Sequence, residues 1–191
     1  MPAQKIWTVG HSTRGIEELI GILNPYRIEL ILDVRRFPGS RRYPQFNESN
    51  LRLALGRSGI DYRHFEALGG RRVPRADSMN IGWRNAAFRG YADPMQTVEF
   101  QKALGKLNES ATEKRTAIMC AEAVWWRCHR ALISDQLKAE GIRVTHIISE
   151  NKEQEHPYTS AAVVLNGRVS YGPAATPLLP DLREASFEDA R

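Results

Sequence analysis

Residues 30–36 read Leu-Ile-Leu-Asp-Val-Arg-Arg, a short aliphatic run that ends in one carboxylate and two guanidinium groups. Three other short runs are similarly apolar, at residues 6–9, 116–120 and 144–148. None of these runs alternates cleanly between apolar and polar residues, which is typical of parallel strands covered on both faces. We therefore expect them to form the centre of a parallel sheet.

Apolar residues at helical spacing lie between the runs and predict three helices. Asp93 and Pro94 are predicted to start the second helix, and Gly141 to end the third. A shorter helix at residues 47–58 and a further strand at residues 61–64 are also expected. The apolar positions that define the three helices are Ile16, Leu19, Ile20 and Leu23, then Phe100, Ala103, Leu104 and Leu107, then Leu132, Ile133 and Leu137.

Strands that alternate with helices predict an α/β fold, with an open, mostly parallel sheet and helices on both faces. Asn166-Gly167 between two apolar runs predicts a C-terminal hairpin. A long arginine-rich loop is expected at residues 68–92, where Gly, Arg and aromatic residues show no sustained period. Residues 1–175 are predicted to form a single domain, and residues 176–191 a poorly ordered tail.

Two interpretations of the arginine-rich loop remain open. Its glycines permit unusual backbone angles, so the loop could close as a lid over a bound anion. Its aromatic residues Trp83, Phe88 and Tyr91 could instead pin it to the sheet as a static wall.

The positive charge of the chain is regional. The net charge of the 191 residues is +5, but residues 27–89 contain 13 Arg, no Lys and six acidic residues, so that this segment alone carries +7. Arginine favours bidentate recognition of phosphate or carboxylate; the base composition of the gene is the alternative explanation. No apolar stretch approaches 18 residues and no secretory signal pattern is present, so we expect a cytoplasmic protein without a membrane partner.

Polar residues follow the predicted strands at the point where each strand ends. In an open parallel sheet, ligands bind outside the carboxyl ends of the strands, so these residues are predicted to line one cleft. The candidate catalytic residues are His11, Asp33, Cys120, Glu122 and Cys128, and the candidate ligand-binding residues are Ser12, Arg35, Arg42, Arg71, His129 and Arg130.

Several of these residues also have a purely structural interpretation. Asp33 could simply pair with Arg35, and Cys120 at a buried strand end could be a small hydrophobic residue. Replacing Arg35 by Ala is expected to abolish ligand binding with little effect on folding. Cys128, beside His129 and Arg130 near a helix start, is expected to carry more thiolate than Cys120, unless it faces the core.

The absence of several familiar sequence motifs argues against some classes of protein. The chain has no G-x-G-x-x-G after its first strand, no P-loop and no G-x-S-x-G elbow, so dinucleotide-binding, P-loop and α/β-hydrolase assignments lack support. The eight-residue step from Cys120 to Cys128 is no zinc knuckle, and no metal site is assigned, although a His, Cys, Cys catalytic site built from different strands stays open. The sequence identifies no cofactor and no oligomeric state.

Seven motifs in order, spanning residues 6–148, together resemble the family known as domain of unknown function 488. The resemblance implies an α/β fold and a bacterial or archaeal cytoplasmic protein, and it implies no established reaction. The motifs are Val9-Gly10-His11-Ser12, Asp33-Val34-Arg35 with Pro38 and Ser40, Pro44 with Phe46, Leu68-Gly69-Gly70, Met119-Cys120-Ala121-Glu122, Cys128-His129-Arg130, and Val144 with His146-Ile147.

Two functions remain. The first is a small enzyme or ligand-binding protein that acts on a small anionic compound, phosphorylated or nucleotide-like, with Glu122 or His11 as general acid or base and a thiol as nucleophile or redox centre. The second is a nucleic-acid binding or processing protein, in which residues 27–89 contact phosphates and the loop aromatic residues stack on bases. We favour the first, because a nonspecific nucleic-acid binder has no need of His, Asp, Cys and Glu at strand ends.

Overall fold

A six-stranded sheet in the order β3-β2-β4-β1-β5-β6 forms the centre of the protein, whose structure, a computed structural model, describes residues 4–172. All neighbouring pairs are parallel except β5 and β6, so the α/β fold class is as predicted. The strands are β1 (Lys5–Gly10), β2 (Leu30–Asp33), β3 (Asp61–His64), β4 (Thr116–Cys120), β5 (Arg143–Ser149) and β6 (Lys152–Glu155).

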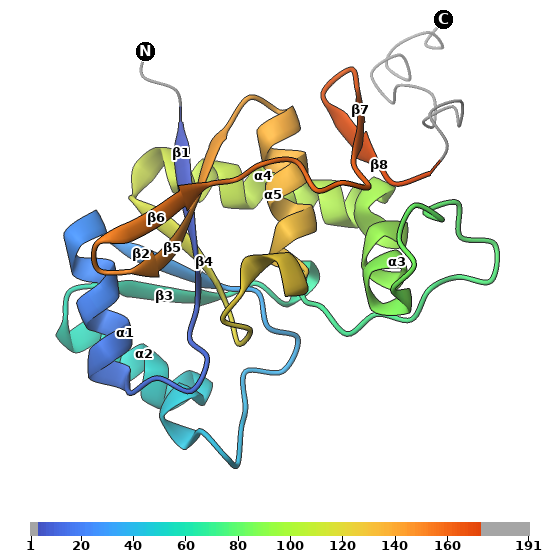
Figure 1. Cartoon of the computed structure of the whole chain (residues 1–191). Coiled ribbons are helices and arrows are strands. Elements are labelled where there is room, and N and C mark those ends of the chain that lie inside the picture. The colour runs from blue at the N-terminus through green and yellow to red at the C-terminus, as the bar shows by residue number, and fades with distance from the viewer. Residues whose placement is uncertain (1–3, 173–191) are drawn as a thin grey trace, which may run out of the picture.

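Helices cover both faces of this sheet, with α1 and α2 on one face and α4 and α5 on the other (Figure 1). The helices are α1 (Ile16–Leu23), α2 (Glu48–Arg57), α3 (Ala86–Ala92), α4 (Val98–Glu113) and α5 (Arg130–Ala139). Short 3-10 turns lie at Asn24–Tyr26, Pro44–Phe46, Glu66–Leu68, Asp93–Gln96 and Trp125–Arg127.

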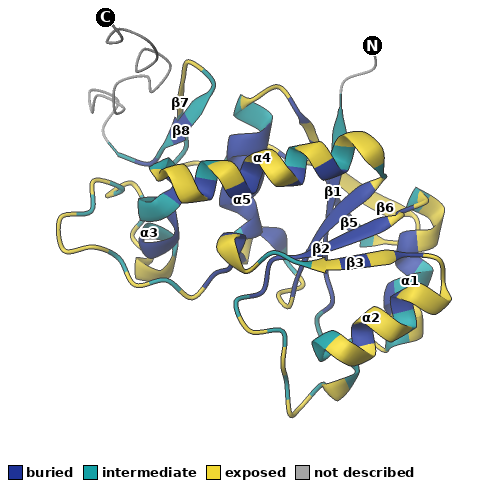
Figure 2. Ribbon diagram, turned by 180° about the vertical axis from the view of Figure 1, so that it is seen from behind, coloured by how far each residue is buried: buried dark blue, intermediate teal, exposed yellow. Residues whose placement is uncertain are grey.

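Successive residues of each central strand enter two different cores, because side chains alternate across a strand. Ile31 of β2 and Met119 of β4 pack with α1 and α2, whereas Leu32 and Ile118 pack with α4 and α5. Figure 2 shows the central strands β1, β2, β4 and β5 and the helix α5 as the most buried elements. Because helices cover both faces of the central strands, apolar and polar residues do not alternate along these strands in the sequence.

The structure differs from the prediction in three elements. Residues 86–92, expected as loop, form α3, which starts where Asn85 Oδ1 accepts a hydrogen bond from Ala87 N at 2.8 Å. The second predicted helix starts at Thr97, whose hydroxyl accepts from Phe100 N at 3.3 Å, while Asp93 begins a separate 3-10 turn. The third is β6, which lies at the sheet edge in a charged segment where no strand was expected.

The predicted hairpin is confirmed, with β7 (Val163–Leu165) antiparallel to β8 (Arg168–Ser170). Asn166 and Gly167 turn the chain with φ of 50° and 73°, the left-handed angles that a two-residue hairpin turn requires. The tail predicted at residues 176–191 lies outside the described residues. Within residues 4–172, no helix is both long and apolar enough to cross a membrane.

Many contacts fix the arginine-rich loop. Asp93 accepts hydrogen bonds from Arg75 N at 2.7 Å, Ser78 Oγ at 2.5 Å and Asn80 Nδ2 at 2.9 Å. Gly82 N donates to the carbonyl oxygen of Tyr171 at 2.7 Å. These bonds favour the static wall over the mobile lid.

Candidate functional site

The carboxyl ends of β1, β2 and β4 lie side by side, because β4 is hydrogen-bonded between the other two strands. The loops that leave them are tied together as well. His11 N donates to the carbonyl oxygen of Cys120 at 3.0 Å, and Val34 N donates to that of Met119 at 2.9 Å. The residues predicted at these three strand ends therefore gather at one edge of the sheet.

Asp33 and Arg35 form an internal ion pair. Arg35 Nε and Nη2 donate to the Asp33 carboxylate, which is fully buried and also accepts from Tyr62 Oη at 2.7 Å. The remaining nitrogen, Nη1, lies 3.3 Å from His11 Nε2. The guanidinium group is thus held by the protein, and a replacement of Arg35 would leave a buried carboxylate unpaired, which corrects the expectation that folding would be little affected.

His11 is a fixed, neutral imidazole. Its Nδ1 donates to the carbonyl oxygen of Ser12 at 2.9 Å, so Nε2 presents its lone pair to Arg35. The ring stacks on Phe46 with centroids 4.0 Å apart. Burial, followed by the charge of Arg35, lowers the pKa of His11 to about 4. Because its pKa is low and both of its nitrogens already have partners, this imidazole is poorly suited to remove a proton from a substrate near neutral pH.

The two cysteines meet His129 beside this ion pair. The Sγ atoms of Cys120 and Cys128 and one ring nitrogen of His129 lie within 4.8 Å of one another. His129 Nε2 donates to the carbonyl oxygen of Val34 at 3.0 Å, which aims Nδ1 at Cys128 Sγ, 3.7 Å away. Two thiolates and an imidazole oriented in this way are donors that a soft metal ion accepts, so these three residues could hold one.

Arg130 supplies a cation in direct contact with this cluster. Its Nε donates to Cys128 Sγ at 3.4 Å. Burial raises the pKa of the Cys128 thiol, but hydrogen bonding with Cys120 and the charge of Arg130 outweigh it and lower that pKa well below its usual range. The same hydrogen bond, with burial, raises the pKa of Cys120 well above its usual range. The two directions agree with the expectation from sequence, although both side chains are at least nine-tenths buried.

The other donors of Arg130 point into the protein rather than to solvent. They reach Thr8 Oγ1 at 3.3 Å and the carbonyl oxygens of Glu122 and Ala123, and only 1% of the residue is exposed. The geometry therefore does not support direct ligand binding by Arg130. It supports a role in fixing the loop after β4 and in placing a positive charge at Cys128.

A buried chain of polar side chains continues behind Arg130. Thr8 Oγ1 lies 2.7 Å from His146 Nδ1, His146 Nε2 lies 2.9 Å from His156 Nδ1, and His156 Nε2 lies 3.0 Å from Asp135 Oδ1. Burial and the charges of His156 and Arg130 lower the pKa of His146 to about 2, and its ring stacks on Trp125. Sequence reasoning noted His146 at its strand but gave no role to Thr8, Asp135 or His156.

The remaining candidates are exposed or half-buried residues at the surface. Glu122 is exposed, and Ser12 is half-buried with a left-handed φ of 54°. Arg42 is exposed over the ring of Tyr43, and Arg71 is exposed directly after Gly70. A Cβ atom on Gly70 would lie 2.7 Å from His129 Nδ1, so the backbone at residue 70 packs on the His129 ring and sets Arg71 beside the cluster.

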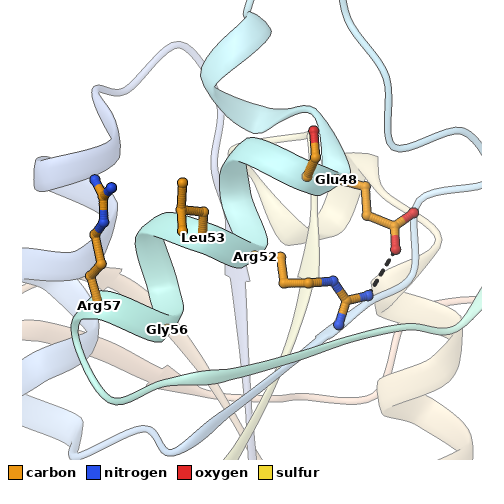
Figure 3. Close-up of a pocket in the computed structure, with 6 residues that line it drawn as sticks. Glu48, Arg52, Leu53, Gly56 and Arg57 are labelled. Carbon is orange, nitrogen blue, oxygen red and sulfur yellow. Dashed lines mark hydrogen bonds and ion pairs between the residues drawn. The ribbon is translucent and has the colours of Figure 1, made fainter.

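Three hollows on the described surface are lined by other residues. The largest lies along the outer side of α2, where Arg52 and Glu48 form an ion pair at 2.9 Å (Figure 3). A second lies between Arg36, Arg72 and α4, and the third lies beside β5 and α5. The strand-end residues therefore share an edge, while a cleft that all of them line stays a prediction.

No curated protein and no solved structure matches the chain. A family match is found for residues 15–137, the part that contains Asp33, Arg35, both cysteines and His129-Arg130. Because this match covers more than half of the chain, the protein belongs to the family described as Domain of unknown function DUF488.

Proposed function

We propose that the protein is a small thiol-dependent enzyme that acts on an anionic compound at the carboxyl edge of the sheet. One observation carries the proposal: Cys128 Sγ lies between Arg130 Nε at 3.4 Å and His129 Nδ1 at 3.7 Å, just before the first turn of α5. A cation, an imidazole and the positive end of a helix dipole all stabilise a thiolate, which is the nucleophilic form of cysteine.

Each residue around Cys128 has a distinct part in this proposal. His129 Nδ1 takes the proton of the Cys128 thiol, the resulting thiolate attacks an electrophilic centre of the substrate, and the same nitrogen passes that proton to the leaving group. Arg130 stabilises the negative charge on the Cys128 sulfur. The Asp33–Arg35 ion pair is a positioning element, because it fixes the end of the neighbouring strand β2.

The anionic nature of the substrate is inferred from the positive charge of residues 27–89, in which Arg71 directly follows the glycine that packs on His129. Arg42 and Arg71 are exposed, and residues 27–89 carry an excess of seven positive charges. Guanidinium groups that face solvent recognise phosphate and carboxylate, so a phosphorylated or nucleotide-like compound fits best. A thiolate enzyme also needs reduced cysteines, and we therefore place the protein in the cytoplasm.

Nucleic-acid binding is less well supported by the contacts. Tyr91 is 1% exposed and donates its hydroxyl to the carbonyl oxygen of Leu68, while Trp83 packs against Phe88 with ring centroids 4.7 Å apart. The aromatic residues considered for base stacking thus pack on the protein itself, which leaves only the arginine residues in favour of this alternative.

Alkylation with reagents of different charge tests the proposal. Iodoacetate carries a carboxylate, whereas iodoacetamide is neutral and otherwise similar. We expect the ratio of their rates at Cys128, resolved by mass spectrometry, to exceed the ratio for free cysteine, because an anion-binding site concentrates iodoacetate. Added phosphate should slow the iodoacetate reaction in particular.

Two matched variants locate the anion site. Arg71→Ala should lower the rate ratio toward that of free cysteine, and Arg57→Ala, at the far end of α2, should leave it unchanged. A wild-type ratio equal to that of free cysteine would overturn the anionic substrate, and a Cys128 that neither reagent modifies in the folded protein would overturn the nucleophile.

A further inference from the structure

We infer that Cys120 and Cys128 form a redox-active dithiol, which is converted to an intramolecular disulfide by a low-molecular-weight disulfide. The inference rests on the reactive Cys128 of the proposed function and adds a second activity, thiol–disulfide exchange. Both cysteines are free, and their Sγ atoms belong to the cluster that spans no more than 4.8 Å.

The positions of the two cysteines in the fold favour formation of the Cys120–Cys128 disulfide. Cys120 ends β4, a central strand, and Cys128 lies two residues before α5. Between them runs a loop in which residues 121–123 are exposed. A disulfide brings its sulfur atoms to about 2.05 Å, so side-chain rotation and a small shift of this loop must supply the remaining approach.

The surroundings of the two sulfur atoms are unequal, as thiol–disulfide exchange requires. Cys128 faces the Arg130 guanidinium and His129, which suits an attacking thiolate. Cys120 packs in the apolar core with Leu32 and Ile118, and its Sγ lies within 4.8 Å of Cys128 Sγ, which suits a thiol that acts second.

The exchange balances in two steps. In the first, the Cys128 thiolate attacks one sulfur of the small disulfide, forms a mixed disulfide and expels one small thiolate. In the second, Cys120 loses its proton to that thiolate and attacks the Cys128 sulfur, which expels the second small thiolate. Two protein thiols are thereby oxidised, and one small disulfide is reduced to two thiols.

The same cluster could hold a soft metal ion, but one contact favours the dithiol. The Arg130 guanidinium lies 3.4 Å from Cys128 Sγ and is anchored by Thr8 and by two carbonyl oxygens of the loop after β4. A fixed positive charge at this distance stabilises a thiolate and repels a divalent cation.

The experiment uses the reduced full-length chain after treatment with a chelator. The protein is equilibrated in glutathione buffers of increasing oxidation, quenched with acid, alkylated and digested for mass spectrometry. We expect a peptide pair joined by a Cys120–Cys128 disulfide that forms and reverses with the buffer. Cys120→Ser and Cys120→Ala should instead hold a persistent mixed disulfide with glutathione at Cys128, and Cys128→Ser should form neither product.

The possible failures are distinguishable. If the wild-type protein keeps the mixed disulfide as firmly as Cys120→Ser does, Cys120 is not a resolving thiol and the dithiol is overturned, while a reactive Cys128 stands. If Cys128 is unmodified in every buffer, the dithiol and the proposed nucleophile fail together. A metal ion that stays bound at one per chain through the chelator would also overturn the dithiol.

Discussion

Arg35 shows how an arginine at a strand end can be structural and still belong to a site. Because the Asp33 carboxylate is fully buried, loss of the guanidinium group leaves it without a positive partner, with only the hydrogen bonds from Tyr62 Oη and the backbone N of residue 35. We expect Arg35→Ala to lower the free energy of unfolding by about 3–5 kcal/mol, the usual effect of breaking a buried pair. Urea denaturation measures this effect.

Arg57→Ala is the matched control for that measurement, because Arg57 is exposed at the end of α2. Its stability should stay within about 0.5 kcal/mol of the wild-type value. If both variants were equally stable, the Asp33–Arg35 pair would contribute nothing to the fold.

His11 predicts a loss of stability in acid. Its pKa is about 4 in the folded protein, below the ordinary value of 6.5, so between these values the unfolded chain binds the extra proton. Stability from this residue is therefore complete above pH 6.5 and is lost as the pH falls. From pH 7 to 4.5 we expect a loss of about 2–3 kcal/mol from His11 alone.

His11→Asn isolates this contribution, because Asn cannot titrate but can still accept a hydrogen bond from Arg35. The difference in unfolding free energy between pH 7 and 4.5 should be smaller in the variant by about 2–3 kcal/mol. An identical pH dependence in the two proteins would contradict a neutral, buried His11.

The sequence predicts which reactive residues lie at the strand ends, but not the direction in which their side chains point or the partners that they bind. Asp33 and Cys120 were identifiable because they lie at the ends of apolar runs, and His129 because it lies near the start of a predicted helix; the structure brings all three to one edge. The sequence could not show that Arg130 spends its hydrogen bonds inside the protein, because its partners are backbone carbonyl oxygens and Thr8 of another strand. His156 carried no signal either, because it follows an exposed edge strand after a charged segment.

The loop between β4 and α5 packs closely on the end of β1. A Cβ atom on Gly10 would lie 1.9 Å from the carbonyl oxygen of Glu122, and this backbone oxygen cannot move away without disturbing Arg130. We expect Gly10→Ala to cost more than about 3 kcal/mol of stability, because two backbone segments would have to separate.

Gly105→Ala is the contrasting variant at the level of a helix. Gly105 lies inside α4, and nothing lies within 4 Å of its added Cβ atom. Alanine there should stabilise the protein by about 0.5–1 kcal/mol, since it lowers the entropy of the unfolded chain. Thermal denaturation should move in opposite directions for the two variants; a shift in the same direction would contradict the close approach at Gly10.

Asp93 predicts how the arginine-rich loop moves. Three of its hydrogen bonds hold residues 75–80, so Asp93→Ala should raise hydrogen exchange throughout that segment. Asp77→Ala, which removes only an exposed ion pair with Arg75, should leave exchange almost unchanged. Exchange that is already fast in the wild-type protein would restore the lid interpretation.

The elements that sequence reasoning missed are those whose stability comes from tertiary contacts. Residues 86–92 contain glycine and too few turns to show a period, and α3 is instead held by Tyr91 in the core. β6 consists of Lys, Glu and Gln, which have no strand preference, and it forms because β5 offers a free edge. By contrast, the buried strands and Asn166-Gly167 have strong local signals.

For the whole molecule, the strand order is what assembles the site. The alternation of strands and helices predicts an α/β sheet, but it is compatible with several strand orders. The observed order, with β4 between β1 and β2, brings together the loops that carry His11, Asp33 and Cys120. The partner of each strand is chosen by packing across the whole core, which no single stretch of sequence encodes.

The pH dependence of cysteine alkylation in the native protein reports whether Cys128 is a thiolate near neutral pH. The rate is followed at each cysteine by mass spectrometry from pH 5 to 10, with free cysteine, whose pKa is about 8.5, as the reference. We predict that Cys128 reacts with a midpoint clearly below that of free cysteine and that Cys120 reacts more slowly and only at higher pH. A Cys128 that reacts no faster than Cys120, or only after unfolding, would show that the folded protein holds no thiolate at this position.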